Sequence, residues 1–167
     1  WVQVRLIMKR LELTDKKRFV DQIWRYPVKS LGAEAVDSLS LKKGKTLPGD
    51  RVWALTYENS RFDLANPSWA PSQTFLRCSI APLFAAVSSK LNASDGTIDF
   101  FHPQLPNISL NLENESDRKN FINWVRPICP EGAPGPIDLC RVPGRGMTDT
   151  SYPSISINSI DSIQDLE

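Results

Sequence analysis

The sequence predicts a mainly β fold with a few helices, and three observations carry this prediction. Large apolar residues alternate with other residues in several short segments, which is the pattern of half-buried strands. These segments recur at intervals of roughly ten residues. Thirteen prolines and eight glycines in 167 residues indicate many turns. We therefore expect a small antiparallel β-barrel, followed by the start of a second β-rich core.

Three alternating segments supply the first strands of the expected barrel: 24–28, 35–41 and 51–57. Pro27 ends the first of them, because proline lacks a backbone donor for the ladder. Turns are expected at 42–45 and 47–50, where glycine and proline provide the dihedral angles. The segment 58–74 has few periodic apolar positions and is expected to be a loop over the barrel.

The middle of the chain predicts a short helix and a hairpin. Around 74–84 the apolar residues fall on one helical face. Segments 87–91 and 98–100 alternate on either side of Asp95-Gly96, a dipeptide typical of hairpin turns. The alternating segment 105–112 adds one more strand.

A second helix is expected from Asn114 or Ser116, either of which is a suitable N-cap, to the residue before Pro127. Its apolar residues recur at helical spacing: Phe121, Ile122, Trp124 and Val125. The Pro- and Gly-rich segment 130–146 reads as a linker.

The last segment is expected to contain a strand at 154–157 and a helix capped by Ser159, with Ile160, Ile163 and Leu166 along one face. These assignments divide the chain into three parts: a leader at 1–18 that is disordered or non-native, a barrel-like domain with its helix and linker at 19–145, and an incomplete second core at 146–167.

Composition restricts the classes of function. A net charge of +1 gives no broad field for nucleic acid or an anionic membrane, and no apolar run approaches the length of a membrane span. Three cysteines, an odd number without CxxC spacing, favour a reducing and hence cytoplasmic location. With His102 they allow a Cys3His zinc site as an alternative, although their spacing is unlike that of known zinc motifs.

Lys29, Ser30 and Arg51 are the candidate anion-binding residues. A lysine point charge, a short hydroxyl and a forked guanidinium suit a phosphate, and neighbouring antiparallel strands can bring both ends of the segment to one rim. We therefore expect the three side chains to converge in one cleft. Taken singly, each is better explained as a solvated residue at the rim of a barrel.

Three motifs resemble those of the MOSC family, the C-terminal domain of molybdenum cofactor sulfurases. They are Tyr-Pro-Val-Lys-Ser at 26–30, Gly-Asp-Arg-Val-Trp at 49–53, and Thr-Asp-Thr-Ser at 148–151 with the following Ser-Ile-Ser-Ile-Asn-Ser at 154–159. The resemblance implies the family's N-terminal β-barrel and the start of its core. It also implies that Lys29, Ser30 and Arg51 hold the phosphate of the pterin cofactor, and that Thr150 and Ser151 face it.

The same resemblance implies a molybdenum-cofactor protein, either an oxidoreductase of the amidoxime-reducing type with an electron-transfer protein as partner, or a sulfur carrier. The family's late cysteine and its Arg-Phe-Arg-x-Asn segment have no counterpart in these 167 residues. We therefore assign no catalytic residue and no metal ligand, and expect a truncated chain that binds no molybdenum by itself. Two alternatives stay open: a non-catalytic interaction module, and a binder of another phosphorylated ligand such as pyridoxal phosphate.

Overall fold

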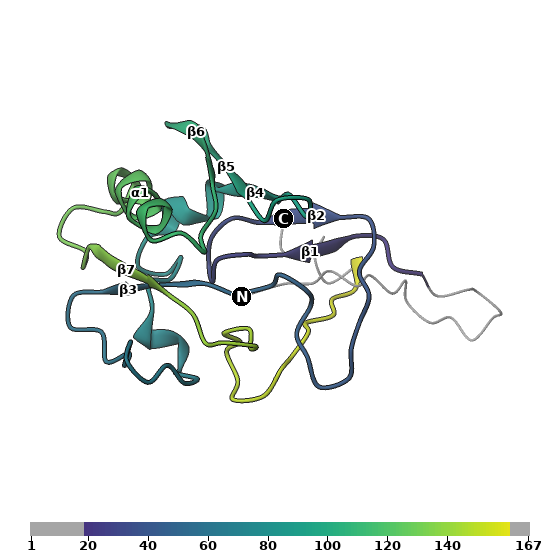
Figure 1. Ribbon diagram of the computed structural model, residues 1–167. Helices are drawn as coiled ribbons and strands as arrows, with labels where there is room; N and C mark the ends of the chain where they lie inside the picture. Colours follow the sequence, from purple (N-terminus) through teal and green to yellow (C-terminus); the bar gives the residue numbers. More distant parts are fainter. Residues whose placement is uncertain (1–18, 161–167) are drawn as a thin grey trace.

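The structure is a computed structural model that describes residues 19–160, and the expected leader at 1–18 lies outside them (Figure 1). The fold is mainly β, as predicted. The strands are β1 (Ile23–Arg25), β2 (Glu34–Val36), β3 (Ala54–Tyr57), β4 (Ser88–Leu91), β5 (Ile98–His102), β6 (Leu105–Leu110) and β7 (Pro136–Cys140). The α-helix is α1 (Glu115–Val125), and three 3-10 turns are η1 (Ser72–Thr74), η2 (Pro82–Ala86) and η3 (Arg126–Ile128).

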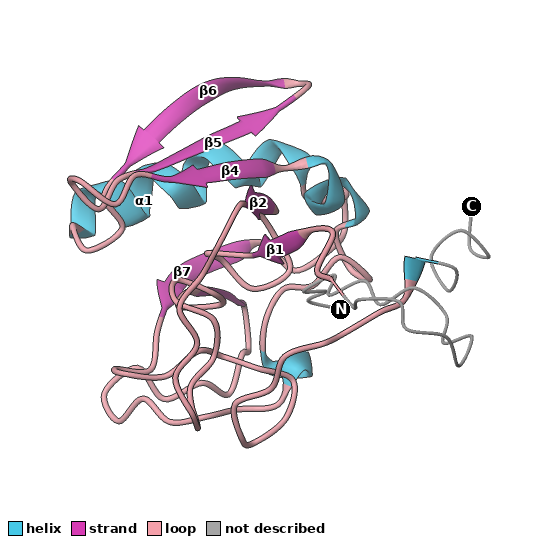
Figure 2. Cartoon of the chain, turned by 90° about the vertical axis from the view of Figure 1, so that its right-hand side faces the viewer, coloured by secondary structure: helices cyan, strands magenta, loops and turns pink. Residues whose placement is uncertain are grey.

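The strands form three small antiparallel sheets, with the orders β1–β2, β3–β7 and β4–β5–β6. Single parallel bridges connect them, from Val28 to Trp53 and from Ala33 to Ser88. Figure 2 shows the three-stranded sheet above β1 and β2, with long loops on the lower side of the molecule. Across residues 19–160 the sheets do not close into one continuous ladder. No helix in this described range is long and apolar enough to cross a membrane.

Helix α1 packs beside β6 and β7 and contributes much of the core. Its N-cap is Asn114, whose side chain accepts a hydrogen bond from the Ser116 amide. The helix ends at Val125, and Pro127 lies in the following η3 turn, as predicted. The ring of Phe100 from β5 lies 4.6 Å from that of Phe121 and 5.9 Å from that of Trp124, so helix and sheet share an aromatic contact.

Two sequence predictions about connecting segments were wrong. The segment 130–146 is not a linker, because β7 lies within it and pairs with β3, with Leu139 and Cys140 buried. Pro136 is tolerated there because it is the first residue of the strand. The segment 74–84 is not one helix: Leu76 donates its amide to the carbonyl of Leu55 in β3, and the next helical turn begins at Pro82.

Strand lengths also differ from the prediction. The expected strand 35–41 is reduced to β2, and 154–157 is not a strand. At 154 the carbonyl oxygen accepts a hydrogen bond from the Arg51 side chain instead of a neighbouring strand. The expected helix after Ser159 begins at Ile160, the last described residue, and its remaining turns lie outside the described range.

Gly146 occupies a position where two loops touch. A Cβ atom added there would lie 2.7 Å from the carbonyl oxygen of Asp50 and 2.8 Å from the hydroxyl oxygen of Thr46. Both distances are shorter than a real Cβ contact, and the first involves backbone that cannot move aside independently. The close approach of the loops therefore requires glycine at this position.

We predict that Gly146→Ala lowers the free energy of unfolding by about 1–3 kcal/mol, the usual effect of inserting an atom into a filled site. Gly135→Ala is the matched control, because its new Cβ would meet no backbone atom and only Nη1 of the Arg126 side chain, at 3.2 Å. Urea unfolding followed by tryptophan fluorescence measures both variants. Equal stabilities for the two would contradict the close packing at Gly146.

Candidate anion-binding site

Two turns far apart in the sequence lie side by side and carry the predicted site residues. The amide of Arg51 donates to the carbonyl of Tyr26 at 2.6 Å, and that of Trp53 donates to Pro27 at 3.2 Å. The amide of Lys29 returns a bond to the Trp53 carbonyl at 2.7 Å. These bonds bring Lys29 and Arg51 together in the interior, where both residues are buried.

Ser30 and Arg51 both have left-handed backbone conformations, with φ of 64° and 51°. A residue other than glycine in this region costs on the order of 1 kcal/mol, and such strained residues are enriched at functional sites. The other case in the described chain is Asn59, a residue type that tolerates the conformation. The two strained turns therefore set the positions of the Ser30 and Arg51 side chains.

Asp50 holds the two turns together from inside. Its buried carboxylate accepts the Tyr26 amide at 2.9 Å and the Nε of Arg51 at 2.7 Å. Burial raises the pKa of Asp50, although the adjacent Arg51 charge and the Tyr26 amide oppose the shift. The guanidinium is thus fixed in place by a neighbour in the chain.

Lys29 binds the segment that follows β7. Its Nζ donates to the Met147 carbonyl at 3.0 Å and to the Asp149 carboxylate at 2.5 Å. The Lys29 side chain is 2% exposed, whereas that of Asp149 is 50% exposed. Burial lowers the pKa of Lys29, and the hydrogen bond and charge of Asp149 oppose this. The ammonium is therefore fixed in the interior, while its counterion lies at the surface.

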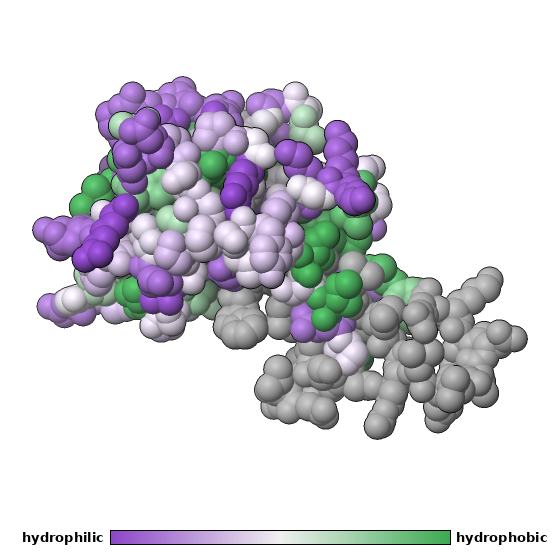
Figure 3. Space-filling view, turned by 90° about the horizontal axis from the view of Figure 1, so that it is seen from below, coloured by the Kyte–Doolittle hydropathy of each residue, from purple (hydrophilic) through white to green (hydrophobic). Residues whose placement is uncertain are grey.

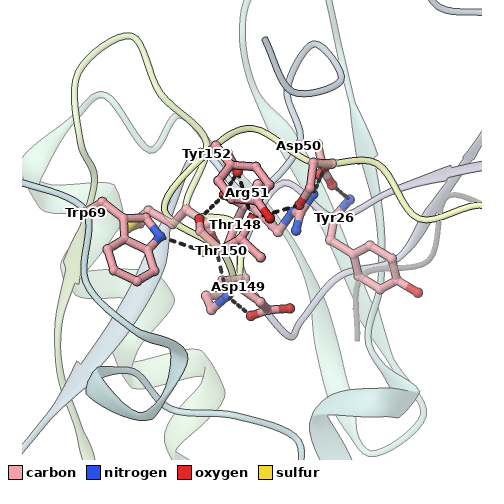
Figure 4. A network of polar contacts seen from close by, with 11 residues as sticks. Tyr26, Asp50, Arg51, Trp69, Thr148, Asp149, Thr150 and Tyr152 are labelled. Carbon is pink, nitrogen blue, oxygen red and sulfur yellow. Dashed lines mark hydrogen bonds and ion pairs between the residues drawn. The ribbon is translucent and has the colours of Figure 1, made fainter. Parts of the chain in front are cut away.

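Two further side chains hold the same segment, and bonds within it brace it (Figure 4). Arg51 donates to the Ser154 carbonyl at 3.1 Å, and the indole of Trp69 donates to the Thr148 carbonyl at 2.9 Å. The buried Thr148 hydroxyl bonds to the carbonyls of Thr150 and Tyr152 within the segment. Residues 147–154 therefore lie across both cations as a latch, a name used below for this segment.

Thr150 and Ser151, the other two predicted site residues, belong to this latch. The Thr150 hydroxyl donates to the Tyr152 carbonyl at 2.8 Å, and the Ser151 carbonyl accepts a bond from Arg145. Ser151 is exposed. Neither residue lines the cavity that Ser30 borders.

A cavity of about 440 Å³ adjoins the Lys29–Asp149 pair. It is lined by Ser30, Ser72, Arg77, Cys78, Ser79 and Asp149. The Nε of Arg77 is buried and has no hydrogen-bond partner, and its guanidinium forms no ion pair with any residue of the described chain. One unpaired cation and three hydroxyls thus border the same space, which is a donor set suited to an oxyanion.

Cys78 is the thiol in this cavity. Its Sγ donates to the Ser30 carbonyl at 2.9 Å, and burial raises the pKa of the thiol. At neutral pH the sulfur is therefore protonated and tied to the backbone of the Ser30 turn. Within residues 19–160 no three His, Cys, Asp or Glu side chains lie close enough to bind a metal, so Cys78, Cys129, Cys140 and His102 do not form the alternative zinc site.

The sequence did not indicate Arg77 or Asp149 as site residues. Arg77 lies in a segment that was expected to be helical, and nothing in its neighbours marks it as functional. Asp149 lies in the Thr-Asp-Thr-Ser motif, but its contact with Lys29 spans 120 residues, so the sequence does not pair the two. A lysine in one motif and an aspartate in another are the sequence features that could have suggested the Lys29–Asp149 ion pair.

The Lys29–Asp149 pair predicts a pH-dependent contribution to stability. Burial raises the pKa of Asp149, but the hydrogen bond and charge of Lys29 outweigh it and place the pKa below its usual 3.8. The contribution is therefore complete above 3.8 and is lost as the pH falls through the lowered pKa. Near pH 6 we expect Asp149→Asn to lower the free energy of unfolding by about 1–2 kcal/mol, since the carboxylate is half exposed.

Urea unfolding across acidic pH measures this, and Asp37→Asn, at an exposed aspartate away from the site, is the control. The difference between the wild type and Asp149→Asn should shrink as the solution becomes more acidic. A difference that stays constant over the whole pH range would show that the ion pair does not stabilise the fold.

Comparison of the chain with models of known protein families, with curated proteins and with solved structures found no match. The interpretation of the site therefore rests on three geometric facts: the buried and converging Lys29 and Arg51, the unpaired Arg77, and the cavity between Ser30 and Asp149.

Proposed function

We propose that this protein binds the phosphate group of a ligand in the cavity beside Lys29. The observation that carries the proposal is Arg77, whose partly buried guanidinium lines the cavity without a protein partner. A partly buried guanidinium without a counterion is costly, and an oxyanion in the cavity would serve as that counterion. The hydroxyls of Ser30, Ser72 and Ser79 would complete the set of donors around the phosphate oxygens.

Lys29 joins this set when Asp149 moves away. The lysine is fixed by burial and by the Met147 carbonyl, whereas the half-exposed Asp149 side chain has room to rotate into solvent. A phosphate would then replace the carboxylate as the counterion of Lys29. The exchange keeps the buried ammonium paired throughout, which is the condition for its charge to remain in the interior.

The ligand we propose is the molybdenum cofactor, whose pterin carries a phosphate. The support is the order and spacing of the three MOSC-like motifs, together with the donor set, which fits the phosphate end of such a molecule. Ser30 and Lys29 would hold that end, and Arg51 would act through the latch it binds. When bound, the cofactor would supply a molybdenum centre for reduction of an N-hydroxylated substrate, with electrons from a partner protein, or for sulfur transfer.

The fold assigned by the same proposal is the small MOSC-type β-barrel. Its support is the parallel bridge from Val28 to Trp53, which joins the sheet of β1 to that of β3 at the two motif turns. The bridge from Ala33 to Ser88 connects the three-stranded sheet in the same way. Short sheets linked around one shared core are the arrangement that a small, partly open barrel requires.

A second function, a non-catalytic interaction module, is favoured by one specific observation. Lys29 and Arg51 each already have protein acceptors, namely Asp149 and Met147 for the lysine, and Asp50 and Ser154 for the arginine. Under this alternative the hydrogen bonds and ion pairs of the two cations serve only to attach the latch to the core. The two functions differ in what removal of Asp149 does to anion binding.

Isothermal titration calorimetry with a pterin phosphate as the ligand tests the phosphate site. We expect Arg77→Gln to weaken binding about tenfold or more, because charge-assisted hydrogen bonds are lost. Arg61→Gln is the matched control, since Arg61 is exposed and lines no part of the cavity. Equal affinity of the Arg77→Gln and Arg61→Gln proteins would rule out the cavity as the phosphate site.

Asp149→Asn separates the two functions in the same titration. If phosphate replaces the carboxylate, the variant should be less stable but should bind the pterin phosphate more tightly than the wild type. If the two cations only attach the latch to the core, the variant should be less stable and should bind the pterin phosphate no more tightly than the wild type. Dephosphorylated pterin gives the reference: its binding should be unaffected by either substitution.

A further inference from the structure

A second cavity, of about 520 Å³, lies between the loops 40–49 and 141–146. It shares no lining residue with the cavity beside Lys29, although Gly146 borders it directly before the latch begins. Both loops lie on the lower side of the molecule in Figure 1, and Figure 3 views that side from below. There, hydrophobic patches interrupt an otherwise pale to hydrophilic surface.

Among the described residues, four cationic side chains and no carboxylate line this cavity. They are Lys42, Lys45, Arg141 and Arg145. The two lysines are exposed and form no ion pair with the described residues. Residues 19–160 therefore leave these two charges without a counterion, and together they give the cavity a positive potential although the whole chain carries only +1.

The two arginines are held in position by aromatic rings. Arg141 lies over the Trp53 ring at 4.9 Å from its centroid and pairs with Glu113, and Arg145 lies 6.0 Å from the centroid of Trp69. The Nε of Arg145 is buried and has no hydrogen-bond partner, while the other end of the guanidinium donates to Ser151. Because that Nε is enclosed by protein atoms, the cations that a ligand in the cavity reaches directly include the two exposed lysines.

The remaining wall is apolar. Leu47 is buried at the base, and Val52, Val142 and two prolines supply further hydrophobic surface. A volume of about 520 Å³ lies within the usual range of small-molecule sites. A cavity with an apolar wall and unneutralised cations is complementary to a molecule that has an apolar body and an anionic group.

We propose that this cavity binds a compact organic anion, a carboxylate or a phosphate monoester on an aromatic or aliphatic body. The apolar body would pack on Leu47 and Val142, and the anionic group would meet the exposed ammonium groups of Lys42 and Lys45. This binding does not depend on the cavity beside Lys29. Inorganic phosphate should bind here only weakly, because it lacks the hydrophobic body that packs on the apolar wall.

Titrations monitored by amide chemical shifts test the site, with phenylacetate and phenyl phosphate as anions, benzyl alcohol as the neutral analogue, and inorganic phosphate as the anion without a body. We expect both aromatic anions to bind about tenfold or more tightly than either reference, and to shift the amides of Gly49, Gly144 and Gly146. Comparison of the two aromatic anions distinguishes a carboxylate from a phosphate ligand. Benzyl alcohol binding as tightly as the anions would overturn the proposal.

The double substitution of Lys42 and Lys45 by glutamine provides the second measurement. Because both side chains are exposed, each charge should contribute modestly, so we expect a loss of roughly three- to tenfold in affinity that shrinks at high salt. Lys43→Gln is the matched control, since Lys43 is an exposed neighbour that does not line the cavity. Arg77→Gln should leave this binding unchanged, which separates the result from that at the other cavity. If the double substitution left the affinity for the aromatic anions unchanged, the proposal that they bind in this cavity would be wrong.

Discussion

The buried carboxylate of Asp50 is the interaction on which the rest of the structure depends. It binds the Tyr26 amide on one turn and the Arg51 side chain on the other, so it fixes the distance between them. Desolvating a carboxylate and a guanidinium costs several kcal/mol, and only complete hydrogen bonding offsets it. Because the Arg51 carbonyl in turn accepts the Met147 amide at 2.8 Å, the latch is built on the same pair. Lys29, the cavity beside it and the loop contact at Gly146 all follow from that arrangement.

Features determined by neighbouring residues were predictable from the sequence. The turns at 42–45 and 47–50 close with bonds from Lys45 to Lys42 and from Asp50 to Leu47, and the hairpin of β4 and β5 turns between Asn92 and Thr97. Helix α1 begins after Asn114 and ends before Pro127 for equally local reasons. In contrast, β7 was hidden in a Pro- and Gly-rich segment, because its strand conformation comes from pairing with β3, 82 residues away at Thr56 and Asp138.

The candidate site was predictable to the same limited extent. Lys29, Ser30 and Arg51 could be identified as candidates because residue type and motif spacing can be read directly from the sequence. The structure does bring Lys29 and Arg51 together. It also shows that both are already paired, which no sequence pattern indicates. The functional meaning of Arg77 comes from the lack of a partner, a property that exists only after folding.

The pairing of β3 with β7 also has a consequence for the order of folding. The segment from β4 to α1 is contiguous and held by local contacts, whereas β3 and β7 close a long loop and the Lys29–Asp149 contact closes a longer one. The entropy of loop closure must be overcome before such distant contacts return any stability, which slows their formation. We therefore expect the hairpins and α1 to form a nucleus onto which the remaining strands dock. The latch, and with it the anion site, would be assembled last and would be the first part to open when the native state fluctuates.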